Sequence, residues 1–84
     1  MVIETFTQGP GPVYERFAER GRMMPPGLEY VDSWIDESRL DRCFQLMETH
    51  DASLFDEWLA NWSDLMEAEI VPVISSREGA ARAT

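Results

Sequence analysis

The chain has 84 residues, with 16 acidic side chains against seven basic ones and a formal net charge of −9. So acidic a chain is a poor partner for nucleic acid or an anionic membrane surface, because both are bound mainly through cationic side chains. Cys43 is the only cysteine and His50 the only histidine. This excludes an intrachain disulfide and leaves too few ligands for a zinc or iron–sulfur site, so we expect no metal and no cofactor.

The first half of the chain predicts a strand followed by a helix. Residues 1–6 are rich in β-branched and aromatic types and are soon followed by a cluster of glycine and proline, as is typical of strands. Pro12 suits the first turn of a helix, and an amphipathic pattern runs from it to about Arg20. Gly21 then provides a favourable left-handed stop.

The middle of the chain, residues 28–49, predicts a β-hairpin around which the other elements are arranged. Its strands are residues 28–35 and 42–49, and the charged segment 36–41 makes the turn. Both strands mix β-branched or aromatic residues with polar ones at alternating positions.

The last part of the chain predicts a second helix, a fourth strand and a tail. Apolar side chains from Leu54 to Met66 recur with a helical period, and Ser53 or Asp51 can cap that helix. Residues 68–74 predict a strand, which Pro72 places at a sheet edge because proline cannot donate to a ladder. Residues 75–84 are mostly small or polar and predict a flexible C-terminal tail.

The order β-α-β-β-α-β predicts an α+β, ferredoxin-like domain over residues 1–74. Such a domain has a four-stranded antiparallel sheet with both helices on one face. Its first and third strands are central, and its second and fourth strands lie at the edges.

The alternation within each strand separates two faces of this sheet. The helix-covered face is expected to carry the stronger hydrophobes, and the other face is then rich in exposed aromatic and apolar side chains. Monomers rarely tolerate an apolar patch of several hundred Å², and a domain this small has a modest core of its own. We therefore expect a homodimer packed through the open face. The expected covered residues are Ile3, Val31, Ile35, Phe44 and Leu46, and the expected open residues are Val2, Glu4, Phe6, Tyr30, Asp32, Trp34, Cys43, Gln45 and Met47.

The polar members of the expected open face are the candidate functional residues. Glu4, Gln45 and Asp32 need hydrogen-bond partners if a dimer buries them. They either bond to one another, or to Arg22 and Arg42, across the dimer, or they line a cavity between the two sheets. In that cavity Glu4 would be a base or anchor for a small, aromatic-sized molecule. The candidate ligand-binding residues are Glu4, Tyr30, Asp32, Trp34, Gln45, Met47 and Arg42.

Other chemically active side chains have simpler explanations. His50 lies at a strand–helix junction, where it is expected to be a surface or capping residue. Cys43 lacks a neighbouring histidine and is interpreted as a small buried hydrophobe. Trp58 and Trp62 are one helical turn apart and are expected in the core. The absence of any stretch like a targeting signal or membrane span, together with the free thiol, favours a cytoplasmic location.

Five segments resemble a family of small bacterial proteins known as a domain of unknown function, number thirty-three-oh-three. They are VIETF, GRMMPPGL, DSW, RCFQLME and FDEWLANW, and the resemblance covers roughly residues 1–74. That family is similar to the dimeric α/β-barrel proteins, in which two ferredoxin-like subunits pack sheet to sheet. The wider group includes cofactor-free monooxygenases, lactone isomerases, haem-degrading enzymes and stress-response dimers. His50 falls before the second helix, so the haem-degrading pattern is not matched.

The sequence thus predicts a small homodimeric α/β-barrel protein that binds a small molecule between its sheets. One alternative is a non-catalytic structural or interaction dimer without a ligand. The other, implied by the resemblance, is a cofactor-free monooxygenase or isomerase.

Overall fold

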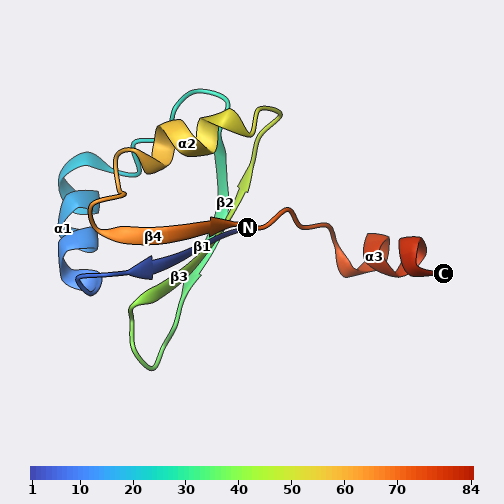
Figure 1. The fold of residues 1–84 in the computed structure, drawn as a ribbon, viewed down its shortest axis with the longest axis horizontal. Coiled ribbons are helices and arrows are strands. Elements are labelled where there is room, and N and C mark those ends of the chain that lie inside the picture. Colours follow the sequence, from blue (N-terminus) through green and yellow to red (C-terminus); the bar gives the residue numbers. More distant parts are fainter.

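The computed structural model describes all 84 residues and contains one four-stranded antiparallel sheet and three helices. The strand order is β2-β3-β1-β4, so the first and third strands are central, and α1 and α2 cover one face of the sheet (Figure 1). The predicted α+β, ferredoxin-like arrangement is therefore confirmed. The elements are β1 (Val2–Phe6), α1 (Pro10–Arg20), β2 (Glu29–Ile35), β3 (Arg42–Glu48), α2 (Ser53–Leu59), β4 (Met66–Ile70) and α3 (Ser76–Ala83).

The second helix is shorter than its apolar pattern predicts. α2 ends at Leu59, and turns carry the chain to β4, which begins at Met66 and ends at Ile70. Trp62 and Met66 are buried all the same, because a turn and a strand bring them to the same core that a longer helix would have reached. β4 is an edge strand as predicted, but Pro72 lies after it and not within it.

The predicted assignment of the two sheet faces is wrong for β1, β3 and Tyr30, and it is confirmed for Ile35, Asp32 and Trp34 on β2. Val2, Glu4 and Phe6 are buried under the helices, and Cys43 and Met47 on β3 share that covered face. Residues paired across neighbouring strands point to the same side, so Glu4, opposite Cys43, lies on the covered face and Ile3, opposite Phe44, lies on the open face.

A register shift in β2 contributes to this error. The pairing of β2 with β3 shifts between Tyr30 and Asp32, so Tyr30 pairs with Met47 while Asp32 pairs with Leu46. A bulge of this kind breaks the two-residue period that the prediction assumed. Tyr30 and Ser33 therefore share the covered face. The open face comprises Ile3, Thr5, Glu29, Asp32, Trp34, Arg42, Phe44, Leu46, Glu48, Glu67 and Glu69.

The core lies between the sheet and the two covering helices, and Trp58 and Trp62 are part of it, as predicted. Both indole N–H groups donate to the backbone oxygen of Arg22, over 2.8 and 3.1 Å. This shared acceptor fixes the connector between α1 and β2 against α2 and the turn that follows it.

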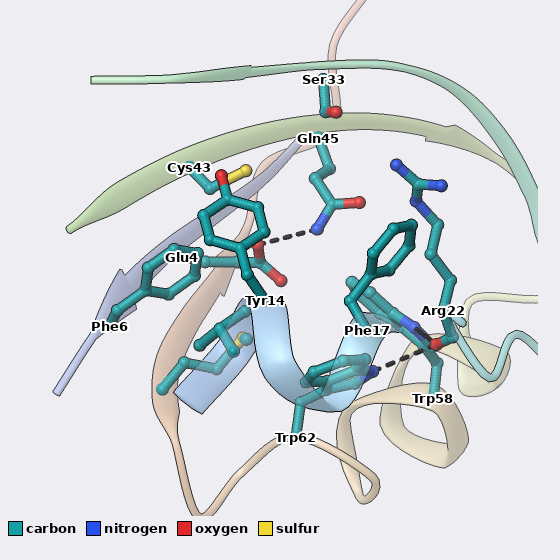
Figure 2. Close-up of a pocket in the computed structure, with 12 residues that line it drawn as sticks. Glu4, Phe6, Tyr14, Phe17, Arg22, Ser33, Cys43, Gln45, Trp58 and Trp62 are labelled. Atoms are coloured by element: carbon teal, nitrogen blue, oxygen red, sulfur yellow. Dashed lines mark hydrogen bonds between the residues drawn. The ribbon is translucent and has the colours of Figure 1, made fainter. Parts of the chain in front are cut away.

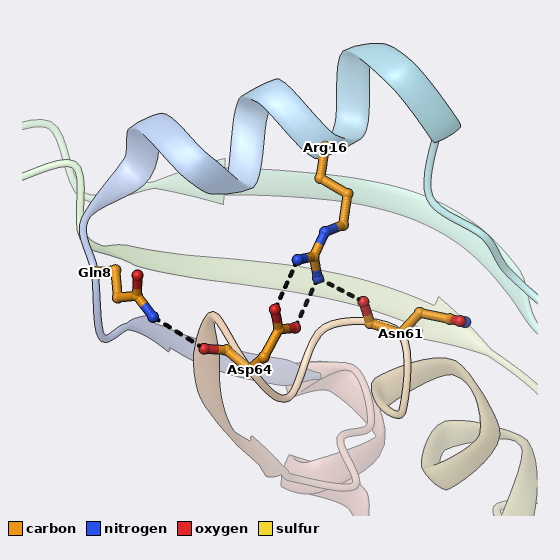
Figure 3. A network of polar contacts seen from close by, with 4 residues as sticks. All are labelled: Gln8, Arg16, Asn61 and Asp64. Carbon is orange, nitrogen blue, oxygen red and sulfur yellow. Dashed lines mark hydrogen bonds and ion pairs between the residues drawn. The ribbon is translucent and has the colours of Figure 1, made fainter.

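A second tether joins α1 to the loop before β4 (Figure 3). The Arg16 guanidinium donates to both carboxylate oxygens of Asp64 at 2.7 Å and to the backbone oxygen of Asn61 at 2.9 Å. Gln8 donates to the backbone oxygen of Asp64 from the other side, over 3.2 Å. These contacts hold α1 in place over the covered face.

The C-terminal segment, predicted to be a flexible tail, contains the helix α3. The Ser75 hydroxyl accepts the backbone N–H of Glu78 at 3.1 Å, which is a side-chain cap. A serine followed three residues later by glutamate is a helix-start pattern, and the prediction overlooked it. Val71 and Met1 exchange two backbone hydrogen bonds of 2.8 Å, after which the chain leaves the domain (Figure 1).

The turn between β2 and β3 stores backbone strain at Leu40, whose φ is 58°. The left-handed region costs a residue with a Cβ about 1–2 kcal/mol, while glycine adopts it freely. We expect Leu40→Gly to raise the free energy of unfolding by about 0.5–1 kcal/mol after the chain-entropy cost of glycine is deducted. Urea unfolding measures the change. Leu40→Ala is the matched control, because it removes the same half-exposed side chain but keeps the strain; equal stability of the two variants would contradict the prediction.

Candidate functional site

A cavity of about 90 Å³ lies between the sheet, α1 and α2 on the covered face (Figure 2). Most of its wall is apolar, and five aromatic rings take part in it. The lining residues are Glu4, Phe6, Val13, Tyr14, Phe17, Arg22, Ser33, Cys43, Gln45, Trp58, Trp62 and Met66.

Two polar side chains occupy the floor of this cavity. Glu4 lies in the middle of the central strand β1 and is only 1% exposed. The side-chain amide of Gln45, on the neighbouring strand β3, donates to Glu4 Oε1 at 2.7 Å. Glu4 Oε2 and Gln45 Oε1 are also buried, and neither has a hydrogen-bond partner. Because buried polar atoms are nearly always paired, two buried acceptor oxygens without partners make the floor a candidate ligand contact.

Burial controls the protonation of this floor. It raises the pKa of Glu4, since the charged carboxylate is disfavoured away from water, and this outweighs the opposing effects of Gln45, Cys43 and the Arg22 charge. Burial, together with the nearby Glu4 charge, raises the pKa of the Cys43 thiol to about 12. Cys43 is therefore a neutral buried thiol and not an activated nucleophile, because the thiolate is the reactive form.

The rim of the cavity is aromatic and carries one cation. The Arg22 guanidinium lies 3.7 Å from the centre of the Tyr30 ring and 4.9 Å from that of Phe17. Tyr14 and Phe17 project from α1 and are 49% and 39% exposed, so they form the side of the cavity nearest solvent. Arg22 is thus held by stacking at the rim, while Tyr14 and Phe17 are only partly covered.

The structure brings together some of the predicted site residues and separates others. Glu4 and Gln45 do lie side by side, but they face the helices and line a cavity within the chain, and not the open face on which they were predicted. Tyr30 and Met47 share the covered face without lining the cavity. The other three predicted residues, Asp32, Trp34 and Arg42, lie on the open face, where they cannot reach a molecule held by Glu4.

The cavity wall contributed by α1 was not predicted. Val13, Tyr14 and Phe17 occupy positions i, i+1 and i+4 of that helix, which place them on one side of it. That spacing was recognised as amphipathic, and it could have identified the wall had Glu4 been assigned to the covered face. His50 is exposed and lies outside the cavity.

The comparisons with known proteins identify a family and no activity. No group of three or more His, Cys, Asp or Glu side chains is arranged to hold a metal ion. None of the helices combines the length and apolar character needed to cross a membrane. No curated protein and no solved structure gives a significant match to the chain. The family model described as Domain of unknown function (DUF3303) matches residues 1–84, and the chain therefore belongs to that family.

Proposed function

We propose that this protein binds a small molecule bearing N–H or O–H donors in the cavity beneath α1, with Glu4 as its anchor. The observation that carries the proposal is the pair of unpaired acceptor oxygens, Glu4 Oε2 and Gln45 Oε1, on the cavity floor. Leaving a buried acceptor without a donor costs about 1–3 kcal/mol. A ligand that supplies two donors to these atoms recovers that cost and is selected over one that supplies none.

The size of the cavity limits the part of the ligand that it encloses. Its volume of about 90 Å³ is smaller than that of engineered cavities that admit benzene, which measure about 150 Å³. The enclosed group therefore has only a few non-hydrogen atoms, fewer than the aromatic-sized ligand expected from the sequence. A wider molecule would have to displace Tyr14 or Phe17 at the rim.

A small primary amine fits these requirements best. An ammonium group carries three N–H donors for the two free acceptors, and its positive charge matches the carboxylate and the surrounding aromatic rings. Its short alkyl part would contact Phe6, Trp58 and Trp62, which line the walls. Binding of a cation also favours the ionised form of Glu4, so its affinity should rise with pH as Glu4 loses its proton.

Catalysis by the same carboxylate is the second candidate function. Burial raises the pKa of Glu4, which makes its carboxylate a stronger proton acceptor than an exposed one. Glu4 would then remove a proton from the bound molecule, and Gln45, bonded to Glu4 Oε1, would keep the carboxylate oriented.

The proposal is tested by titrating ethylamine, with ethanol as the uncharged comparison, and following backbone amide shifts by NMR. Glu4→Gln keeps the volume and the Oε1 acceptor but replaces the free acceptor with an N–H₂ donor. Loss of a charge-assisted hydrogen bond of about 1.5–3 kcal/mol should weaken ethylamine binding by roughly 10- to 100-fold. Glu57→Gln on the exposed side of α2 is the matched control, with unchanged affinity expected.

Three results would overturn the proposal. The first is equal ethylamine affinity of Glu4→Gln and the unmodified chain. The second is shift changes confined to surface residues, away from Glu4, Gln45 and the aromatic wall. The third is absence of saturation for both probes at millimolar concentration.

We also propose that two copies pack through the open face of the sheet. Trp34 is 52% exposed there, and Ile3, Phe44 and Leu46 form an apolar strip across the neighbouring strands. A contiguous exposed apolar patch is typical of an interface. Light scattering at micromolar concentration should give the mass of a dimer, and Trp34→Glu should shift the mass towards the monomer. A monomer mass for the unmodified chain would contradict the proposal.

A further inference from the structure

The C-terminal arm, defined as residues 71–84, projects away from the domain, and no side chain of its helix α3 is buried. α3 has eight residues, and Figure 1 shows it well separated from the sheet and from α1 and α2. Isolated helices shorter than about 12–15 residues are marginal in water. A short, side-chain-capped helix that packs on nothing in its own domain therefore indicates that it packs against a surface on another molecule.

The segment that leads to α3 is apolar and exposed. Val73 is 50% exposed and Ile74 is 45% exposed, and Ile70 at the end of β4 is 38% exposed. Solvent-facing connectors are normally polar, since exposed apolar runs promote association. The exposed Val73 and Ile74 side chains and the helix α3 that follows them thus pack on nothing within the domain.

The length of the arm matches the width of a sheet like this one. Five extended residues span roughly 17 Å at about 3.3 Å each, and eight helical residues add about 12 Å. Four strands spaced about 4.8 Å apart are roughly 15–19 Å wide. The arm is therefore long enough to cross the open face of a second copy from edge to edge.

The charges of the arm and of the open face are complementary. The open face carries five acidic residues against the single Arg42, namely Glu29, Asp32, Glu48, Glu67 and Glu69. Two such faces brought together would repel each other. The arm, by contrast, carries two arginines, Arg77 and Arg82, against one glutamate, Glu78, so it supplies the cations that a contact between two open faces lacks.

We propose that the C-terminal arm of each copy crosses to the second copy in the dimer. In this arrangement the two open faces oppose each other with the arms between them. Val73 and Ile74 pack on the apolar strip of the second copy's open face, and Arg77 and Arg82 lie beside the Glu67 and Glu69 carboxylates of its edge strand β4. The proposal rests on the homodimer proposed above. It adds the exchange of arms, which makes the dimer contact reciprocal: each copy is both donor and acceptor of an arm.

The test uses two full-length charge-reversal variants and sedimentation velocity. In the first variant, Arg77→Glu and Arg82→Glu reverse the charge of the arm. In the second, Glu67→Arg and Glu69→Arg reverse the charge of the open face along β4. Each variant alone places like charges together, so its dimer should be weaker by roughly tenfold or more. Mixed in equal amounts, the variants offer an acidic arm to a basic face and a basic arm to an acidic face, and a heterodimer should form.

The matched control is Arg20→Glu with Arg39→Glu, which makes the same change in net charge as the arm variant at exposed positions away from the arm. It should dimerise like the unmodified chain. If the unmodified chain is a monomer, the homodimer and the arm exchange both fail. If both reversal variants dimerise as tightly as the unmodified chain, the homodimer stands and the arm exchange is wrong. If both are monomers and the mixture stays monomeric, the arm does not cross between copies, and the exchange is again wrong.

Discussion

Replacing Trp58 with alanine is expected to lower the free energy of unfolding by about 3–5 kcal/mol, the usual cost of truncating a buried aromatic side chain. Trp58 is 1% exposed, lies in the core and donates its indole N–H to the backbone oxygen of Arg22. Natural domains are stable by about 5–15 kcal/mol. The substitution should therefore leave little net stability, visible as a large drop in the urea midpoint followed by far-ultraviolet circular dichroism.

Two further variants make this result interpretable. Trp58→Phe keeps most of the ring volume and removes only the N–H donor, so it should cost less than alanine and remain folded. Glu57→Ala, one position away on the exposed side of α2, should change stability by less than about 0.5 kcal/mol. If Trp58→Ala lowered the free energy of unfolding no more than Glu57→Ala, the burial of Trp58 would not contribute to stability as expected.

Glu4→Gln is expected to stabilise the protein at neutral pH, which is unusual for a change at a buried strand position. Burial raises the folded-state pKa of Glu4 above its ordinary value of 4.5. The protonated form suits the folded state, so its contribution to stability is fully present below about pH 4.5 and is lost as pH rises through the folded-state pKa. Glutamine stays neutral throughout and should gain about 1–3 kcal/mol over glutamate at pH 7, the cost of an unpaired buried acceptor.

The measurement compares urea unfolding of the unmodified chain and Glu4→Gln from pH 4 to pH 8. The stability difference should be small at the acidic end, grow as pH rises from about 4.5, and level off once Glu4 is ionised in the folded protein. Glu57→Gln should show no such pH-dependent difference. A Glu4→Gln variant that is less stable than the unmodified chain at pH 7 would mean that the Glu4 carboxylate is stabilised by a cation, with Arg22 as the nearest candidate.

The order of the elements and the edge position of β4 could be predicted because strong local signals specify them. Glycine and proline separate the first strand from α1, and the hairpin has alternating residues on both sides of a charged turn. The edge position of β4 follows from the order of the elements and not from Pro72, since Pro72 lies after the strand and not within it. The burial of Trp58 and Trp62 followed from their spacing in the same way.

Which face of the sheet the helices cover could not be predicted, because the side chains on each side of every strand include both polar and apolar residues. Hydrophobicity favoured Ile3 and Phe44 as covered residues, yet the protein covers Glu4 and Cys43 instead. The cavity explains the preference for polar side chains at a covered position, and the cavity itself depends on α1, which lies far from Gln45 in sequence. The shift in register between Tyr30 and Asp32 leaves no signal in the alternation either.

The two indoles that share the Arg22 carbonyl have a consequence for how a molecule could reach Glu4. Moving the connector would break both indole hydrogen bonds at once, those of Trp58 and Trp62. Tyr14 and Phe17 on α1 are 49% and 39% exposed, and a change of their rotamers breaks only ring contacts, such as the one of 4.9 Å between Phe17 and the Arg22 guanidinium. The connector is therefore fixed, whereas the Tyr14 and Phe17 side chains can rotate. The rate at which a small molecule exchanges between the cavity and solvent should follow this side-chain rotation and not the unfolding of the domain.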